Sequence, residues 1–252
     1  MTKEKILSRD QLEGRNVVIE ALRREKRRIQ AVYLDAQAKR NIKVEDILNL
    51  SSRQGVSVKR VSRQELDKMS KTGVHNGVIA LADPLPSWTT KDLIDDVFNR
   101  GEFPFLILAD EIQYEHNLGA ILRSAMGAGV HGVIVPSKRG KGLTPVVQRV
   151  SMGGAEVVPL IRESLMSAIK HIKKAGIPLV AADMDGVSLW ETNLKGSLAL
   201  VLGGESKGVS PTLRSKCRKI VSVPLHHNLD SLNVSVTAGI VMFEKCRQEQ
   251  KG

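Results

Sequence analysis

Three segments of the chain combine polar side chains with glycines, and each directly follows an apolar run that is typical of a buried strand. They are DEIQYEHNLGAILRSA (110–125), LVLGGESKGVSP (200–211) and VPLHHNLDSLNVSVTAGIVMFEKC (223–246). In open parallel sheets, ligands bind beyond the carboxyl ends of the strands, where such segments meet. These segments therefore hold the candidate residues for catalysis and ligand binding.

Two residues of the first segment could serve a ligand. Asn117 is placed to cap a helix that begins with LGAILRSA (118–125), and this structural role accounts for its presence. Arg123 lies two turns further on, among small and apolar residues. Its side chain either runs along the surface to solvent or binds a phosphate group.

The second and third segments offer backbone as well as side chains. The adjacent Gly203 and Gly204 would let a ligand approach the backbone closely, and we expect a functional role for Glu205 beside them. In the third segment, Ser231 is a suitable N-cap for the following helix. Asn233 would then lie in the first turn, where backbone amides are free.

Other familiar motifs are absent or misplaced. GAGVHG (127–132) matches GxGxxG, but it follows a helical pattern and precedes a strand, which is the reverse of a dinucleotide-binding fingerprint. We expect a helix end and a turn there, and this excludes a Rossmann-type oxidoreductase. The two cysteines, Cys217 and Cys246, and the adjacent His226 and His227 lack the spacing of metal ligands, so we expect reduced thiols and no metal site.

The alternation of apolar runs with helical patterns predicts an α/β domain with a parallel sheet and helices on both faces. Strands are expected at 105–109, 132–136, 156–161, 178–182, 198–203 and 219–224, and helices at 118–129, 145–152, 164–175, 211–217 and 232–248. We assign residues 103–252 to this domain.

Residues 1–82 predict a separate, small α/β domain. Its helices are expected at 16–25 and 44–55, and its strands at 31–34, 56–61 and 77–82. Two prolines and a Ser-Thr cluster in ADPLPSWTTKD (82–92) indicate a linker, which we place at 83–102.

The charge balance points to a polyanionic partner. The chain has 38 Lys and Arg against 27 Asp and Glu, a net charge of +11, and only 3% aromatic residues. A basic surface binds nucleic acid through its phosphates, whereas base stacking requires clustered aromatic residues. We expect RNA to contact the N-terminal domain at Arg23, Arg24, Arg27 and Arg28. Ordinary globular composition, no apolar run of about 18 residues and no secretory signal predict a cytoplasmic protein that does not enter a membrane.

Together, the motifs N-x-G-A-I-x-R (117–123), G-G-E-x-x-G (203–208) and S-L-N-V-S (231–235) resemble those of the SpoU (TrmH-type) RNA ribose 2′-O-methyltransferases, a family of the SPOUT superfamily. GRNVVIEAL (14–22) and GVHNGVIALA (73–82) are similar to the RNA-recognition module of the family members that act on large-subunit ribosomal RNA.

The resemblance implies a homodimeric enzyme with a C-terminal trefoil knot that binds S-adenosylmethionine. By position, the cofactor-binding residues would be Gly203, Gly204, Val223, Leu225 and Leu232. The residues implied for catalysis and RNA positioning are Asn117, Arg123, Glu205, Ser231 and Asn233. Two departures affect the cofactor loop: Leu225 replaces a usual Met and His227 a usual Gly.

The expected reaction is methyl transfer to a guanosine ribose of large-subunit ribosomal RNA. Two alternatives stay open at this point. One is a tRNA ribose methyltransferase, and the other is a non-catalytic RNA-binding or ribosome-assembly factor with the same fold.

Overall fold

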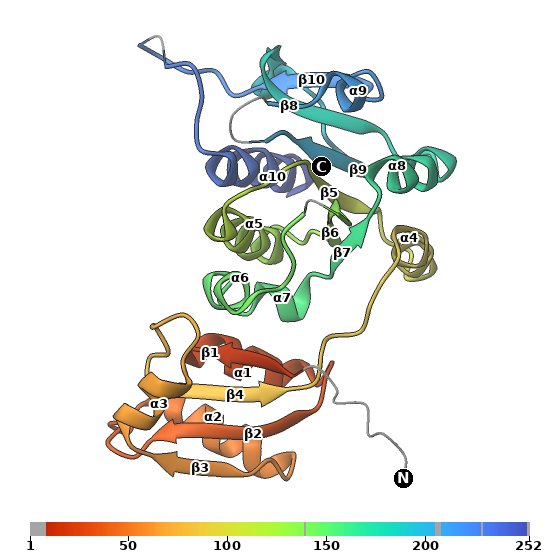
Figure 1. The fold of residues 1–252 in the computed structure, drawn as a ribbon. Helices are drawn as coiled ribbons and strands as arrows, with labels where there is room; N and C mark the ends of the chain where they lie inside the picture. Colours follow the sequence, from red (N-terminus) through yellow and green to blue (C-terminus); the bar gives the residue numbers. More distant parts are fainter. Residues whose placement is uncertain (1–8, 139, 205–207, 228, 251–252) are drawn as a thin grey trace. The chain divides into compact units, whose positions relative to one another are not determined.

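The computed structural model describes residues 9–138, 140–204, 208–227 and 229–250. Its contacts divide the chain into two compact units (Figure 1). Unit 1 comprises Met1–Pro86 and Leu143–Val157, and unit 2 comprises Ser87–Gly142 and Val158–Gly252.

Unit 2 contains the predicted parallel sheet. Its strands are β5 (Phe105–Ala109), β6 (Gly132–Pro136), β7 (Leu160–Glu163), β8 (Leu179–Ser188), β9 (Leu198–Leu202) and β10 (Lys219–Ser222). They are arranged in the order β10-β8-β9-β5-β6-β7, and every neighbouring pair is parallel. The central strands β5 and β9 are buried along their whole length, which explains their uninterrupted apolar sequences.

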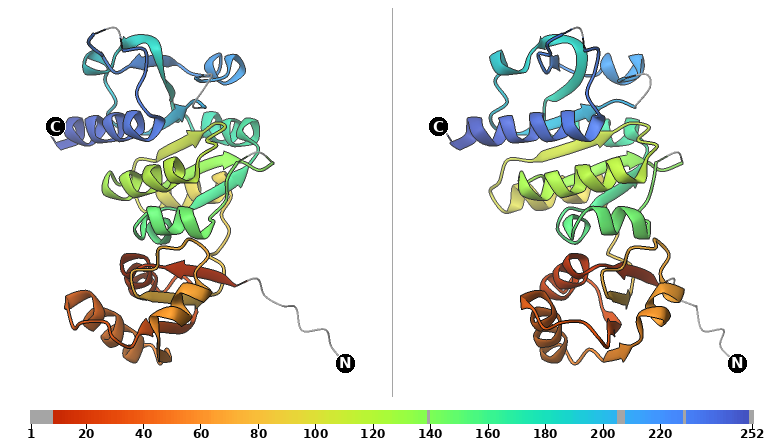
Figure 2. Two further views of the ribbon diagram at one scale, coloured as in Figure 1. Left: turned by 60° about the vertical axis from the view of Figure 1, so that its left-hand side comes forward. Right: turned by 90° about the vertical axis from the view of Figure 1, so that its left-hand side faces the viewer.

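Helices cover both faces of this sheet, as predicted (Figure 2). On one face, α4 (Thr90–Asn99) packs beside α8 (Leu165–Lys174); on the other, α5 (Glu115–Gly127) packs beside α10 (Val234–Gln250). Alternate strand residues such as Leu106 and Leu108 join the core with α4 and α8, because successive side chains of a strand point to opposite faces. Two short elements, η1 (Leu189–Glu191) and α9 (Pro211–Arg214), connect the C-terminal strands.

Two sequence predictions in this region need correction. The expected linker contains helix α4, which is capped by Thr89 and buries Leu93, Ile94 and Val97. The strand expected at 156–161 begins only at Leu160, because Pro159 interrupts it and the preceding residues form a short helix, α7 (Gly154–Val157).

Unit 1 is built on a mixed sheet in the order β1-β4-β2-β3, in which only β2 and β3 are parallel. Its elements are β1 (Asp10–Glu13), α1 (Arg15–Arg24), β2 (Ile29–Asp35), α2 (Ile42–Arg53), β3 (Val58–Val61), α3 (Arg63–Met69) and β4 (Val78–Ala82). Helices α1 and α2 pack together and share a core with β2 and β4. Neither β1 nor α3 is among the elements predicted from the sequence.

The fold adds a segment to unit 1 that the sequence boundaries assign to the second domain. Helix α6 (Pro145–Val150) contacts β1, and α7 contacts α1. Residues 143–157, which lie between β6 and β7 in the sequence, thus belong to unit 1 and not to unit 2.

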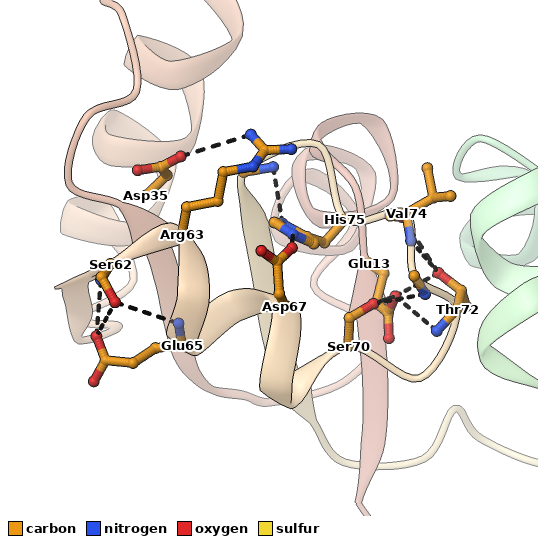
Figure 3. Close-up of polar contacts among 12 residues, drawn as sticks. Glu13, Asp35, Ser62, Arg63, Glu65, Asp67, Ser70, Thr72, Val74 and His75 are labelled. Carbon is orange, nitrogen blue, oxygen red and sulfur yellow. Dashed lines mark hydrogen bonds and ion pairs between the residues drawn. The ribbon is translucent and has the colours of Figure 1, made fainter.

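A buried carboxylate organises the loop after α3 (Figure 3). Glu13 accepts hydrogen bonds from the Lys71 amide at 2.6 Å and from the Ser70 hydroxyl at 2.7 Å, and also from both the amide and the hydroxyl of Thr72. Burial alone would raise the pKa of Glu13, but these hydrogen bonds together lower it below 4.5. The ionised carboxylate therefore fixes the loop to β1.

Candidate active site

A cleft of about 820 Å³ opens in unit 2 beside the middle of β8 and beyond the carboxyl ends of β9 and β10. Eight residues that the family resemblance implies line it together: Asn117, Gly203, Gly204, Val223, Leu225, Ser231, Leu232 and Asn233. They come from three segments that are far apart in the sequence. The fold therefore brings the three polar segments of the sequence into one cavity.

The glycines of the second segment are required by close backbone packing. A Cβ atom on Gly203 would lie 2.0 Å from the backbone carbon of Gly208, a distance that no side chain can tolerate. Gly204 and Gly208 also pair through two backbone hydrogen bonds, of 3.0 and 3.2 Å. Gly203, Gly204 and Gly208 all line the cleft. Glu205 lies outside the described residues.

A side-chain hydrogen bond joins the first and third segments. The Asn233 amide donates from Nδ2 to Oδ1 of Asn117 at 3.1 Å. The Oδ1 atom of Asn233 accepts from the Ser235 amide at 2.8 Å, so Asn233 occupies the N-cap position of α10. The expected caps were wrong: α10 begins after Asn233 rather than after Ser231, and α5 begins two residues before Asn117.

The carboxylates of this cleft were not predicted from the sequence. Asp183, on β8, accepts from the Met184 amide at 2.8 Å and from Arg214 at 3.2 Å, and Asp230 also lines the cavity. Arg214 bridges Asp183 to Asp185, and this ion pair lowers the pKa of Asp185. The available signal was the run AADMDG, which places two carboxylates just where a strand of the parallel sheet should end.

Arg123 does not line the cleft, although Asn117 on the same helix does. Its side chain is exposed on α5. Arg123 is six positions after Asn117, which corresponds to a rotation of about 240° around an α-helix. The two side chains therefore point in different directions.

The loop that carries Leu225 keeps the backbone conformation expected for glycine. His227, where the family usually has Gly, adopts φ 58°, in the left-handed region. This conformation is costly for a residue with a Cβ atom, but it leaves Leu225 lining the cleft.

The basic residues of unit 1 fall into two groups. Arg23, Arg24 and Arg28 are exposed, although Arg23 pairs with Glu20 and Asp46. The prediction that Arg27 contacts RNA needs correction, because its side chain is fully buried.

The buried Arg27 guanidinium binds several groups within unit 1, including the Asp83 carbonyl. It pairs with Asp10 at 2.7 Å and with the buried Glu156, and it donates to Gln148 at 2.8 Å. Burial raises the pKa of Glu156 in spite of this ion pair. Arg27 is therefore a structural residue, and the run of basic letters alone could not reveal this.

Comparisons with known proteins identify the same family as the motif residues that line the cleft. Residues 104–243 match the family model described as the SpoU rRNA Methylase family, and residues 11–88 match RNA 2′-O ribose methyltransferase substrate binding. The 23S rRNA (guanosine-2′-O-)-methyltransferase RlmB of Escherichia coli is 36% identical over 93% of this chain and 97% of its own length. A putative TrmH family tRNA/rRNA methyltransferase, YacO of Bacillus subtilis, is 33% identical over 95% of this chain and 96% of its own.

A solved structure shares the fold. The SpoU methyltransferase AviRb from Streptomyces viridochromogenes, crystallised with AdoMet, superposes with a TM-score of 0.76 at 23% identity, covering 96% of this chain and 91% of its own. No helix among the described residues has the length and apolar character needed to span a membrane. The motifs, the cleft they form and the match over more than half of the chain show that the protein belongs to the SpoU rRNA methylase family.

Proposed function

We propose that this protein transfers a methyl group from S-adenosylmethionine to the ribose 2′-hydroxyl of a guanosine in large-subunit ribosomal RNA. The observation that carries the proposal is the single cleft in which Gly203, Leu232 and the Asn117–Asn233 pair meet. The RlmB relatives, of which that of Escherichia coli aligns over 97% of its own length, are 23S rRNA guanosine-2′-O-methyltransferases, and this supports the same reaction and substrate.

The cleft suits S-adenosylmethionine in size and chemistry. Its volume of about 820 Å³ lies in the usual range of small-molecule sites, roughly 300–1,000 Å³. Gly203 and Gly204 would hold the cofactor by backbone, while Val223, Leu225 and Leu232 offer apolar contacts. The Asp230 carboxylate also lines the cavity and would favour a cation such as a sulfonium, whereas the charge of Asp183 is compensated by Arg214.

When bound, the cofactor would supply an electrophilic methyl group: the ribose oxygen would form the new C–O bond as the C–S bond breaks, the neutral thioether would leave, and the hydroxyl proton would be released to solvent. The contribution of the protein is to orient the ribose and to manage the proton of its hydroxyl. The side-chain amides of Asn117 and Asn233 are hydrogen-bonded to each other, and both line the cleft. They can therefore fix the orientation of the ribose. Ser231 lines the same wall and offers a hydroxyl to the RNA.

We assign Arg123 to the phosphate beside the target ribose. A guanidinium has a pKa above about 12 and is a poor general base, but it binds phosphate and stabilises developing negative charge. Its exposed position on α5 is open to RNA. Replacing it with Ala should lower kcat far more than it weakens cofactor binding, and unchanged turnover would remove Arg123 from the mechanism.

Unit 1 is proposed as the substrate-binding module. The exposed Arg23, Arg24 and Arg28 would contact RNA phosphates, and the family match to residues 11–88 supports this role. Charge reversal at these three positions should weaken RNA binding and reduce its salt dependence. An unchanged salt slope would place the RNA contact elsewhere.

We further propose a trefoil knot, a homodimer and a cytoplasmic location. β8 lies between β9 and β10 although it precedes both in sequence, which suits a threaded chain. The half-exposed Phe243 and Val236 on α10 provide apolar surface for a partner subunit. An experimental structure traced through 179–234, sedimentation analysis and cell fractionation would test the three points.

The decisive test is methyl transfer with purified components. The full-length protein is incubated with isotopically labelled S-adenosylmethionine and deproteinised large-subunit ribosomal RNA, and 2′-O-methylation is mapped. One guanosine should acquire the label. Labelling of tRNA alone would favour a tRNA methyltransferase, and absence of cofactor binding at millimolar concentration would favour an assembly factor.

A further inference from the structure

A second cleft, of about 570 Å³, opens at the carboxyl edge of the same sheet in unit 2. It lies beyond β5 and β6 and beside the start of α8. Its apolar surface includes Leu165, Met166 and Leu213, and its polar groups include Asp110, Glu111 and Lys138. A cavity that combines apolar contacts with several hydrogen-bonding groups can hold a small polar ligand such as a nucleobase.

The second cleft borders the methyl-transfer cleft. Gly204 lines the first cleft and Glu111 the second, and the two residues are in contact: a Cβ atom on Gly204 would lie 3.4 Å from Cβ of Glu111. The nucleobase and the 2′-hydroxyl of one nucleotide are attached to adjacent ribose carbons. A nucleotide with its ribose in the first cleft therefore has its base within reach of the second.

The polar groups of the second cleft select the kind of base. Asp110 is half-buried, accepts a hydrogen bond from the Ser210 side chain, and has its pKa raised by burial and by neighbouring Glu111. Carboxylates beside an RNA-binding site repel phosphates, so their presence indicates a ligand with N–H donors. Guanine is the RNA base whose Watson–Crick edge presents two adjacent donors, N1–H and the N2 amine, which match one carboxylate.

We propose that this second cleft binds the guanine base of the target nucleotide and that Asp110 accepts hydrogen bonds from its N1–H and N2 amine. The inference rests on the proposed methyl transfer and adds the group that makes it specific for guanosine. Leu165 and Met166 contact the face of the base, and Lys138 lies at the rim, where a phosphate can reach it.

The test uses the full-length enzyme and a synthetic fragment of the mapped target RNA with guanosine, inosine or adenosine at the methylated position. Inosine lacks only the N2 amine. Losing a hydrogen bond to a charged group should slow the wild-type enzyme by roughly ten- to a hundredfold on inosine RNA. Adenosine should be a poorer substrate still, because its N1 atom is an acceptor that faces the carboxylate.

Asp110→Asn then separates base recognition from a structural role. An Asn amide can pair with the adenine edge, as it does in adenine recognition elsewhere. The variant should lose rate on guanosine RNA and gain relative rate on adenosine RNA, with S-adenosylmethionine affinity unchanged by calorimetry. Asp95→Asn makes the same charge change at an exposed site on α4 and should leave the preference for guanosine intact.

The outcomes distinguish this inference from the proposed function. Equal wild-type rates on guanosine and inosine RNA would overturn the guanine site while leaving methyl transfer established, and this comparison needs no variant. An equal loss by Asp110→Asn on all three RNAs would also overturn it. If the wild-type enzyme methylates none of the fragments, the proposed function itself fails.

Discussion

At the scale of the residue, Asn233 performs two separable tasks. Its Oδ1 atom caps α10 through the Ser235 amide, and its Nδ2 atom donates to Asn117 at 3.1 Å. Only the second contact joins the first turn of α5 to the segment before α10. A substitution that keeps the cap but removes Nδ2 therefore tests whether the link between the loops matters for catalysis.

Asn233→Ser should keep the fold and lose activity. Serine caps helices about as well as asparagine, but its side chain is too short to reach Asn117. We expect a melting temperature close to that of the wild type, cofactor affinity within a few-fold and methyl transfer reduced by about tenfold or more, since a hydrogen bond contributes about 1 kcal/mol or more.

Asn233→Ala is the matched control for the cap. It should lose the same activity and also about 1 kcal/mol of stability. Methylation rates and thermal melts of both variants, combined with Asn117→Ala, give a double-mutant cycle. Full activity of the Asn233→Ser variant would show that the amide pair is only structural.

Glu13 makes the stability of unit 1 sensitive to acid. Its folded-state pKa lies below 4.5 because Thr72, Ser70 and Lys71 hydrogen-bond the carboxylate. The stabilisation is thus fully present above about pH 4.5 and is lost as the pH falls through the lowered pKa. Hydrogen exchange of unit 1 peptides between pH 6 and 3 should show this loss.

Glu13→Gln should remove that part of the pH dependence and cost about 1–3 kcal/mol at neutral pH, because an amide nitrogen would face backbone donors. Glu45→Gln, exposed in the first turn of α2, should change little. An identical acid transition in the Glu13→Gln variant would assign the acid sensitivity to other groups.

At the scale of the element, the loop between β10 and α10 retains a glycine-like turn without a glycine. His227 has φ 58°, whereas neighbouring His226 does not adopt a positive φ. The left-handed conformation costs a residue with a Cβ atom about 1–2 kcal/mol. The family's preference for glycine at this position is therefore a preference for this backbone shape.

His227→Gly should stabilise the protein by up to about 1 kcal/mol and leave cofactor affinity equal or tighter, because the strained turn is relieved. His226→Gly should instead be neutral or destabilising, since it only adds freedom to the unfolded chain. Urea unfolding and calorimetry would compare them. Equal effects of the two substitutions would show that the loop does not store strain at His227.

Elements with uninterrupted apolar sequences could be predicted closely. The strands 105–109 and 132–136 have the predicted bounds, because buried parallel strands need no alternation and end at charged or turn residues. Helix α4 was missed because its start, with Trp88, Thr89 and Thr90, looks like a linker, although Leu93, Ile94 and Val97 have helical spacing.

Some residues of the candidate site could be predicted from the sequence. Gly203 is one, because the close backbone packing around it leaves no room for a side chain. Asn233 is another, because it belongs to a recognisable motif, and it caps α10. Burial of a charged residue could not be predicted, because it depends on a partner distant in sequence. Arg27 is indistinguishable from Arg28 until Glu156 is placed beside it. Asp183 and Asp110 were missed for the same reason: their surroundings come from other strands.

At the scale of the whole molecule, unit 1 is completed by residues 143–157, which follow β6 in the chain. The buried Arg27 has partners in both chain segments of unit 1. Asp10 lies on β1 in the first segment, and Gln148 and Glu156 lie on α6 and α7 in the second. A fragment that ended near residue 86 would bury the same guanidinium without Glu156. Unit 1 is therefore not expected to fold stably as a continuous N-terminal fragment.

A double-mutant cycle on the Arg27–Glu156 ion pair tests most directly whether residues 143–157 belong to the core of unit 1. Arg27→Met should cost about 3–5 kcal/mol, because it leaves the buried Glu156 carboxylate without its partner. Glu156→Leu should cost less, because Arg27 keeps its ion pair with Asp10. The double variant removes both fully buried charges, leaves only the partly exposed Asp10 unpaired, and should be more stable than Arg27→Met. Urea unfolding followed by hydrogen exchange in peptides from α1 and α7 measures the stability of the unit. Arg24→Met, at an exposed position, should change it by no more than about 0.5 kcal/mol. Additive losses in the double variant would mean that Arg27 and Glu156 do not share one buried environment, and residues 143–157 would then not belong to the core of unit 1.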